Sequence, residues 1–284
     1  MILVFTAIIS LVVSLATCIV FFCLTKKRMS EKKVAELVIE QEKEDCFIYH
    51  SEPIKDYTLN NFFTDDLSFI EKMKSLLDNY SSNSPIILRG STGVGKTHLM
   101  HAFENYLLEK NPSLKTYFVS AESFSCEFIF SLQNYKSNKF KEKYRNLDAL
   151  FIDDLNFLRK KEGTQEELFY TISELLKKKA FVCFGVYTPF SLKEGFSDRL
   201  INLINGIQID LPAPGFEAKR RKIMQIFSGA KCHVNEDIVD YLAKFECGFN
   251  ELVGLCKKLI LMKQLEGKEC VNLKIEDIKS FIEY

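Results

Sequence analysis

A glycine-rich run between an apolar strand pattern and a helical pattern constrains the fold of this chain more than any other feature. Residues 90–97 read GSTGVGKT and match G-x-x-x-x-G-K-[ST] at every position. Ile86, Ile87 and Leu88 precede the run and are typical of a buried parallel strand. Glycines allow successive backbone N–H groups to converge on phosphate oxygens, and the helix that follows directs its positive end to the same point. The run therefore predicts a phosphate-binding loop in an α/β domain.

Residues of the loop have separate expected tasks. The Lys96 ammonium supplies a charge for the outer phosphates and is a candidate catalytic group, and the Thr97 hydroxyl is a candidate Mg²⁺ ligand. His98 and His101 lie one turn into the helix, and we assign neither a catalytic role. The predicted nucleotide-binding residues are Gly90, Ser91, Thr92, Gly93, Val94, Gly95, Lys96, Thr97 and His98.

A second apolar strand pattern, LDALFIDD over residues 147–154, ends in two acidic residues. Asp153 is placed to hold Mg²⁺ through water, and Asp154 is the second candidate catalytic residue, which would orient or deprotonate an attacking water. The alternative is that the two carboxylates cap the next turn.

Strand and helix patterns alternate in the middle of the chain, and only helical patterns follow. Further strands are predicted over residues 116–120, 180–186 and 207–211, and a helix over residues 164–178. After Pro214 the helical segments cover residues 218–226, 237–244, 250–265 and 275–282. The patterns predict a parallel α/β sheet flanked by helices over residues 56–212 and a small all-α lid over residues 213–284. The ligand would lie at the carboxyl ends of the strands, against the lid.

The first residues have the composition of a transmembrane helix. Residues 2–24 contain no charged side chain and would reach about 35 Å as a helix, enough for a hydrocarbon core of about 30 Å. A cleaved signal peptide is the alternative, but no basic residue precedes the apolar run. Basic residues that follow it favour a body in the cytoplasm; these are Lys26, Lys27, Arg28, Lys32 and Lys33. We expect a single-pass anchor over residues 1–25 in the inner (cytoplasmic) membrane and a charged tether over residues 26–55.

Charge and cysteine content narrow the classes of function. Lys plus Arg and Asp plus Glu each number 38, so the formal net charge is zero, which argues against autonomous binding to duplex DNA. The nine cysteines show no C-x-x-C spacing. We expect them to be reduced and mostly buried, in preference to metal ligands or disulfides.

A basic segment with interleaved aromatic residues lies between the second and third predicted strands. Its aromatic residues are Phe140 and Tyr144, and Glu142 lies among the cations. Such a segment could track the backbone of single-stranded DNA, or it could be a solvated helix face, and the pattern leaves both open. The cations are Lys136, Lys139, Lys141, Lys143 and Arg145.

Several segments together resemble the bacterial replication initiator DnaA family of the AAA+ ATPases. They are YTLNNF over residues 57–62, GKTHLMHA over 95–102, KYRNLD over 143–148, the Asp153-Asp154 pair, and KEGTQEE over 161–167. The resemblance covers roughly residues 56–284. It implies binding of ATP or ADP with Mg²⁺, with residues 57–62 near the adenine. It also implies assembly with other AAA+ subunits or a full-length initiator, and contact of the basic helices with single-stranded DNA.

The sequence departs from the family pattern at several positions. The arginine-finger position, four residues beyond Arg199, is Leu203, and the lid-arginine position is Asn250. After the strand predicted over residues 180–186, the family has a polar sensor residue, an Asp, and Tyr187 or Thr188 takes its place here. An arginine finger contributes about 10³–10⁵ to the rate of phosphoryl transfer, so any hydrolysis is expected to be slow. The sequence given ends where the family's helix-turn-helix domain would begin, so we do not expect recognition of specific duplex sequences.

Three hypotheses for the function follow. The first is a membrane-anchored, ATP-binding relative of the initiator that acts in chromosomal replication initiation or its regulation. The second is a slow AAA+ ATPase that works in a mixed assembly. The third is a nucleotide-stabilised scaffold at the membrane without a role on DNA.

Overall fold

Strands and helices alternate along the part of the chain that the structure describes. The computed structural model describes residues 53–80, 84–188, 194–265, 275 and 278, which all belong to the unit Ser51–Tyr284. The first elements are η1 (Leu59–Asn61), α2 (Phe69–Asp78), β1 (Ile86–Gly90), α3 (Lys96–Lys110), β2 (Thr116–Ser120), α4 (Ala121–Gln133), α5 (Ser137–Arg145) and β3 (Ala149–Asp153). They are followed by η2 (Leu155–Leu158), α6 (Glu162–Lys177), β4 (Phe181–Tyr187), α7 (Asp198–Ile204), β5 (Ile207–Asp210), α8 (Phe216–Gly229), α9 (Glu236–Ala243) and α10 (Phe249–Leu265).

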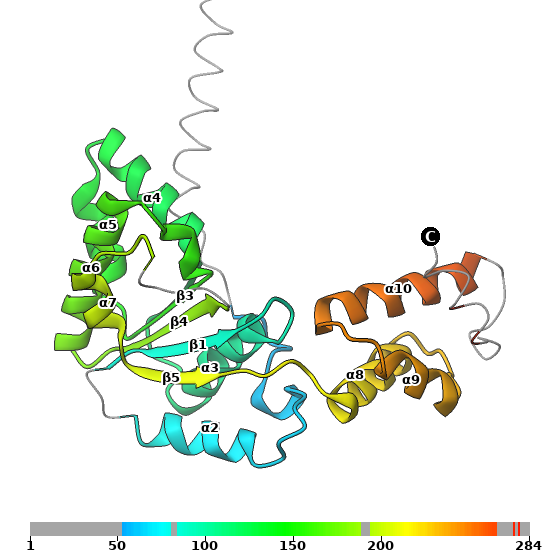
Figure 1. Ribbon diagram of the computed structural model, residues 1–284. Helices are drawn as coiled ribbons and strands as arrows, with labels where there is room; N and C mark the ends of the chain where they lie inside the picture. Colours follow the sequence, from blue (N-terminus) through cyan, green and yellow to red (C-terminus); the bar gives the residue numbers. More distant parts are fainter. Residues whose placement is uncertain (1–52, 81–83, 189–193, 266–274, 276–277, 279–284) are drawn as a thin grey trace, which may run out of the picture. The chain divides into compact units, whose positions relative to one another are not determined.

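The five strands form one parallel sheet in the order β2-β3-β4-β1-β5 (Figure 1). β4 lies between β1 and β3, and Gly90 at the end of β1 is level with Tyr187 at the end of β4. Asp153 is the last residue of β3. The loop after β1 and the carboxylates after β3 therefore reach the same edge of the sheet, on either side of β4. This is the edge at which parallel α/β sheets bind ligands.

Helices cover the sheet, and its central strands are buried. All five residues of β3 are buried, as expected of a parallel strand with covered faces. α3 packs against β1, β3 and β4, and α6 packs against β4. Figure 1 shows α4 to α7 grouped away from α2 and α3. The predicted parallel sheet with flanking helices is confirmed.

Helices α8, α9 and α10 follow β5 and pack around an apolar core of their own, in which Phe227, Leu242 and Leu252 are buried. The start of α8 and the start of α10 both contact the α/β part. The Asp65 carboxylate accepts hydrogen bonds from the backbone N–H groups of Gly215 (2.7 Å) and Ala218 (3.0 Å) at the start of α8. The Phe249 N–H at the start of α10 donates to the Gly93 carbonyl at 2.8 Å. These bonds hold α8 against the segment that contains Asp65, and α10 against the phosphate loop.

Several expectations from the sequence fall outside the described residues. They are the membrane span over residues 2–24, most of the tether, and nearly all of the helix over residues 275–282. Among the described residues, none of the helices has both the length and the apolar character that a membrane crossing needs.

Among the described cysteines, the expectation of reduced side chains is wrong for Cys232. Cys126, Cys183, Cys247 and Cys256 are free, whereas Cys232 is disulfide-bonded. Pairing depends on which cysteines the fold brings together, and sequence spacing alone does not give it.

Candidate nucleotide-binding site

Two glycines give the phosphate loop a backbone conformation that other residues rarely adopt. Gly93 and Gly95 have φ angles of 77° and 99°. A Cβ atom on Gly95 would also lie 2.9 Å from the Phe62 ring. Val94 is buried between the two glycines and anchors the loop to the core. Conformation and space therefore both require glycine at position 95, as in loops whose backbone approaches a bound anion.

The Lys96 ammonium lies inside the loop without a carboxylate bonded to it. The residue is only 8% exposed, and its Nζ donates hydrogen bonds to the carbonyls of Gly90 (2.9 Å) and Ser91 (2.8 Å). Burial lowers the pKa of Lys96, and the charges of Asp153 and Asp154 oppose that shift. A buried cation held by neutral carbonyls retains a full charge to offer a phosphate.

Thr97 and Asp153 lie together as oxygen ligands for Mg²⁺ would. The Thr97 hydroxyl donates to Asp153 Oδ2 at 2.5 Å, and Asp153 is buried. No group of three or more His, Cys, Asp or Glu side chains that could hold a metal occurs among the described residues. Mg²⁺ is usually held by one or two protein oxygens, water and substrate phosphates, so this small ligand set fits it.

Asp154 follows β3 in a left-handed conformation, with φ of 51° and ψ of 46°. Its backbone N–H donates to Asp153 Oδ1 at 2.8 Å. Burial raises the pKa of Asp154, the adjacent Asp153 carboxylate raises it further, and Lys96 opposes the shift. A carboxylate with a raised pKa at the edge of a ligand cavity is suited to accept a proton from water.

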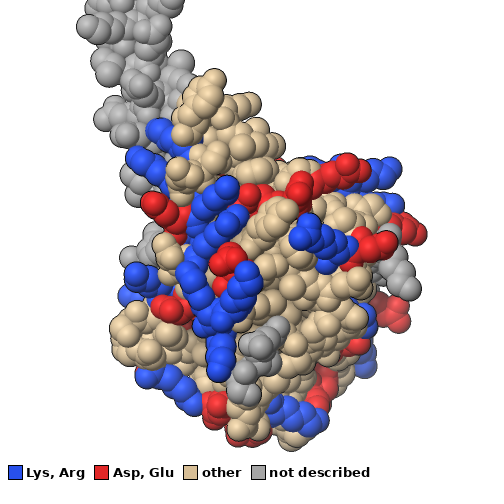
Figure 2. Space-filling view, turned by 90° about the vertical axis from the view of Figure 1, so that its left-hand side faces the viewer, with Lys and Arg blue, Asp and Glu red and all other residues tan. Residues whose placement is uncertain are grey.

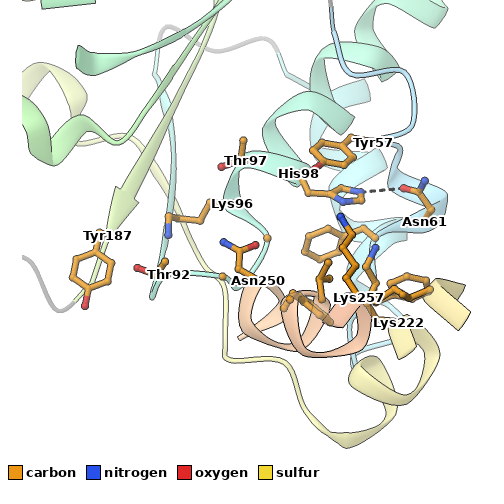
Figure 3. A pocket seen from close by; sticks show the side chains of 18 of the residues that line it. Tyr57, Asn61, Thr92, Lys96, Thr97, His98, Tyr187, Lys222, Asn250 and Lys257 are labelled. Carbon is orange, nitrogen blue, oxygen red and sulfur yellow. Dashed lines mark hydrogen bonds between the residues drawn. The ribbon is translucent and has the colours of Figure 1, made fainter. Parts of the chain in front are cut away.

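A cavity of about 840 Å³ opens beside the loop, between the N-terminal segment of the described chain and helices α8 and α10. Its size is within the range of about 300–1,000 Å³ typical of small-molecule sites. Figure 3 shows Lys96, Thr92 and Tyr187 at one side of it and His98 and Asn61 at the other. Tyr187, and not Thr188, is the residue of this strand end that lines the cavity, and its ring centroid lies 6.0 Å from Lys96 Nζ.

His98 forms part of the far wall of the cavity and is held as a neutral ring. Tyr57 stacks on it with a centroid distance of 4.5 Å. Its Nε2 lies 3.2 Å from the Thr58 carbonyl and 3.0 Å from Asn61 Oδ1, an oxygen that already accepts from the Thr58 N–H. Both neighbours are acceptors, so Nε2 carries the hydrogen. Burial is the main cause that lowers the pKa of His98 to about 4.

The structure brings most of the predicted residues into one site. Thr92, Gly93, Gly95, Lys96, Thr97, His98 and Asp154 line the cavity. Gly90 and Ser91 do not line the cavity themselves. Their backbone carbonyls accept the hydrogen bonds that hold Lys96 in place. Apart from Asn250, which stands at the family's lid-arginine position, residues from the lid were not predicted. Asn250, Val253, Gly254 and Lys257 reach the cavity from one face of α10, and Lys222 reaches it from α8. Their helical spacing was visible in the sequence, but which face would meet the loop was not.

Two of the five predicted DNA-contacting cations are engaged by carboxylates. Lys143 pairs with Glu127 at 2.9 Å, and Arg145 pairs with Glu167 at 2.7 Å. Within the described ranges, no ion pair involves the remaining three cations of the segment, Lys136, Lys139 and Lys141. Figure 2 looks onto the side of the molecule where α4 to α7 lie and shows Lys and Arg side chains gathered there, with a few acidic ones among them.

A parallel sheet of this order, a glycine loop with a buried lysine, a Thr–Asp pair and a helical lid define a P-loop nucleotide-binding domain of the AAA+ kind. The sequence profile of the bacterial DnaA ATPase domain matches residues 55–210. The chain therefore belongs to the DnaA ATPase domain family.

Solved structures agree with this assignment. Domain III of the Thermotoga maritima replication initiation protein DnaA is 26% identical with a TM-score of 0.72, over 80% of this chain and 96% of that one. A replication initiator DnaA bound to AMPPCP and single-stranded DNA is 28% identical with a TM-score of 0.66, over 76% of this chain and 67% of the other. AMPPCP-bound DnaA from Aquifex aeolicus is 29% identical with a TM-score of 0.64, over 74% and 67%.

The family's arginine positions have other residues here, and the structure shows where these lie. Asn250 lines the cavity at the start of α10. Leu203 lies on the short helix α7 with Arg199. The Arg199 guanidinium lies 3.9 Å from the centroid of the Phe169 ring and 5.3 Å from that of Tyr170. No ion pair of Arg199 is found within the described residues.

Proposed function

We propose that this chain binds ATP or ADP with Mg²⁺ and acts in chromosomal replication initiation or its regulation. The observation that carries the proposal is the buried Lys96 ammonium, held by the Gly90 and Ser91 carbonyls at the mouth of a cavity large enough for a nucleotide. DnaA structures with AMPPCP bound support the same ligand. In this arrangement Lys96 would hold the outer phosphates, and Thr97 with Asp153 would hold Mg²⁺.

Hydrolysis is proposed to be slow. Asp154 is placed to accept a proton from the attacking water, but Leu203 and Asn250 offer no cation at the positions where the family has arginine. Bound Mg²⁺ would supply charge neutralisation at the phosphates. Turnover should therefore be low for the chain alone and lower still in Asp154→Asn. If a full-length initiator raised turnover in the wild type and not in Asp154→Asn, the chain would be one subunit of a mixed assembly.

Single-stranded DNA is the proposed nucleic-acid partner. A DnaA structure with AMPPCP and single-stranded DNA supports this choice. Lys139 and Lys141 lie within α5 and have no ion pair among the described residues, so they are the cations proposed to bind it. We expect the double variant K139Q/K141Q to bind an oligonucleotide more weakly and with a smaller dependence on salt. Equal binding by this variant and the wild type would remove α5 from the proposal and favour a scaffold without a role on DNA.

Membrane anchoring is proposed from the sequence of residues 2–24 and the basic residues that follow them. The body would then lie on the cytoplasmic side of the inner membrane. Fractionation tests this point: the protein should stay in the membrane pellet at high pH and be released by detergent. Recovery in the high-pH supernatant would contradict the anchor.

A further inference from the structure

The cavity has cations at two separate places, and the phosphate loop accounts for only one of them. Lys96 lies at the loop, whereas Lys222 of α8 and Lys257 of α10 line the other side, beside His98 (Figure 3). Beside burial, the charge of Lys222 makes a small contribution to lowering the pKa of His98, which agrees with this placement. Neither lysine has a part in the nucleotide binding proposed above.

The second place lies too far along α10 to serve the same phosphates as the loop. The backbone of α10 touches the loop at its first residue, where the Phe249 N–H donates to the Gly93 carbonyl at 2.8 Å. Lys257 comes eight residues later on the same helix, which is about 12 Å along the axis at about 1.5 Å per residue. Phosphates held at Lys96 therefore leave Lys257 facing the sugar and base end of the ligand.

The two lysines lie close enough for their charges to interact, and the described residues place no carboxylate in the cavity wall beside them. Burial lowers the pKa of the half-buried Lys222, and the charge of Lys257 lowers it further. Lys222 Nζ donates to Gln225 at 2.9 Å, and it lies 5.5 Å from the centroid of the Phe63 ring. Among the described residues that line the cavity the acidic side chain is Asp154, at the loop. Two neighbouring ammonium groups without an acid favour the entry of an anion.

We propose that Lys222 and Lys257 form a subsite for a phosphate carried on the ribose of a nucleotide whose 5′ phosphates occupy the loop. The inference rests on the proposed nucleotide binding. The 2′ and 3′ hydroxyls are the ribose positions that can carry such a group. An ammonium binds phosphate as a point charge, so the pair suits a phosphate ester of either geometry. The ligand class is a nucleoside 5′-diphosphate or 5′-triphosphate with one additional phosphate on its ribose.

The test compares three probes on the full chain purified in detergent: ADP, ADP with a 3′-phosphate, and ADP with a 2′-phosphate. Each displaces a fluorescent ADP analogue. At least one phosphorylated isomer should bind about tenfold more tightly than ADP, because a charge-assisted bond to phosphate is worth about that factor. The isomer that gains identifies the position of the phosphate.

Substitutions show whether the higher affinity for the phosphorylated isomer depends on Lys222 and Lys257. K222M/K257M should bind ADP within about twofold of the wild type and lose the advantage of the phosphorylated isomer. K231M/K244M removes the same charge from exposed lid positions outside the cavity and should keep the advantage. If K222M/K257M fails to fold, K257M alone changes an exposed residue and should lose part of the gain.

Equal affinity of all three probes for the wild type, or an advantage that survives in K222M/K257M, would overturn the subsite. Absence of ADP binding altogether would instead overturn the proposed nucleotide binding on which it rests.

Discussion

Lys96 and Lys143 are both poorly exposed lysines of this chain, yet their surroundings give them opposite roles. Lys96 lies in a glycine loop and donates to two backbone carbonyls at 2.8–2.9 Å. Lys143 lies on α5 and pairs with Glu127, whose carboxylate also accepts from the hydroxyls of Tyr117 and Tyr144. The first cation keeps its charge for a ligand, and the second uses its charge to hold α5 onto α4.

A lysine that is paired with a carboxylate stabilises the fold, whereas a lysine held only by backbone carbonyls is available to bind an anionic ligand. Glu127 is only 4% exposed and would be a buried, unpaired charge without Lys143. Lys96 has carbonyls as its partners, so a phosphate could add to its contacts without competing with a protein carboxylate. The comparison predicts that removing each lysine affects different properties: stability at α5, and ligand binding at the loop.

The largest expected effect is the loss of stability in Lys143→Met. Glu127 would remain buried without its cation, so the free energy of unfolding should fall by about 2–4 kcal/mol. Urea unfolding monitored by circular dichroism measures it. Lys139→Met, on the exposed surface of the same helix, is the matched control and should stay within about 0.5 kcal/mol of the wild type. The double variant E127Q/K143M should recover part of the loss. Equal free energies of unfolding for K143M and K139M would show that Lys143 has no structural role.

Gly95→Ala tests the geometry that holds Lys96 in place. Alanine at position 95 would be forced into a φ of 99°, and its Cβ would lie 2.9 Å from the Phe62 ring. Both the backbone conformation and this close contact are unfavourable, so about 1–3 kcal/mol of stability should be lost together with nucleotide binding. Gly163→Ala serves as the control, since nothing lies within 4 Å of the added Cβ. If G95A bound nucleotide as well as the wild type, the loop geometry would not matter for the ligand.

His98 gives a pH dependence to the cavity wall. Burial lowers the pKa of His98 to about 4 in the folded protein, against about 6.5 when unfolded. The unfolded chain therefore binds more protons between these values, and stability should fall as pH falls through this window, by about 1–2 kcal/mol from pH 7 to pH 5. His98→Gln should flatten that part of the profile in urea titrations. A profile of unchanged slope would show that other groups cause the acid sensitivity.

The smallest expected effect is on the stability of Lys96→Met without ligand. This substitution removes a buried charge that has no carboxylate within ion-pair distance among the described residues, so the free energy of unfolding should change by less than about 1 kcal/mol and can increase. Thermal unfolding without nucleotide measures it. A loss as large as that of K143M would mean that Lys96 is a structural cation and that the two lysines do not differ.

The fold and the phosphate loop follow from local patterns, whereas the partners of the cations do not. Residues 86–97 contain strand, loop and helix start within one short run, so the site could be predicted from them. Lys143 could not be recognised as structural, because Glu127 comes from a different helix and only packing brings them together. Lys222 and Lys257 were missed for the same reason: they reach the cavity only because α8 is bonded to Asp65 and α10 is bonded to the Gly93 carbonyl of the loop.

Titration calorimetry of ATP with Mg²⁺ on the full chain in detergent, wild type beside Lys96→Met, measures whether the buried ammonium binds the nucleotide. If the buried ammonium is kept for a ligand, the wild type will give a saturable heat of binding at one site per chain. The K96M variant, shown to be folded by its thermal unfolding, will then give none. A wild type that takes up no nucleotide, or a K96M variant that binds it as tightly, would contradict the account.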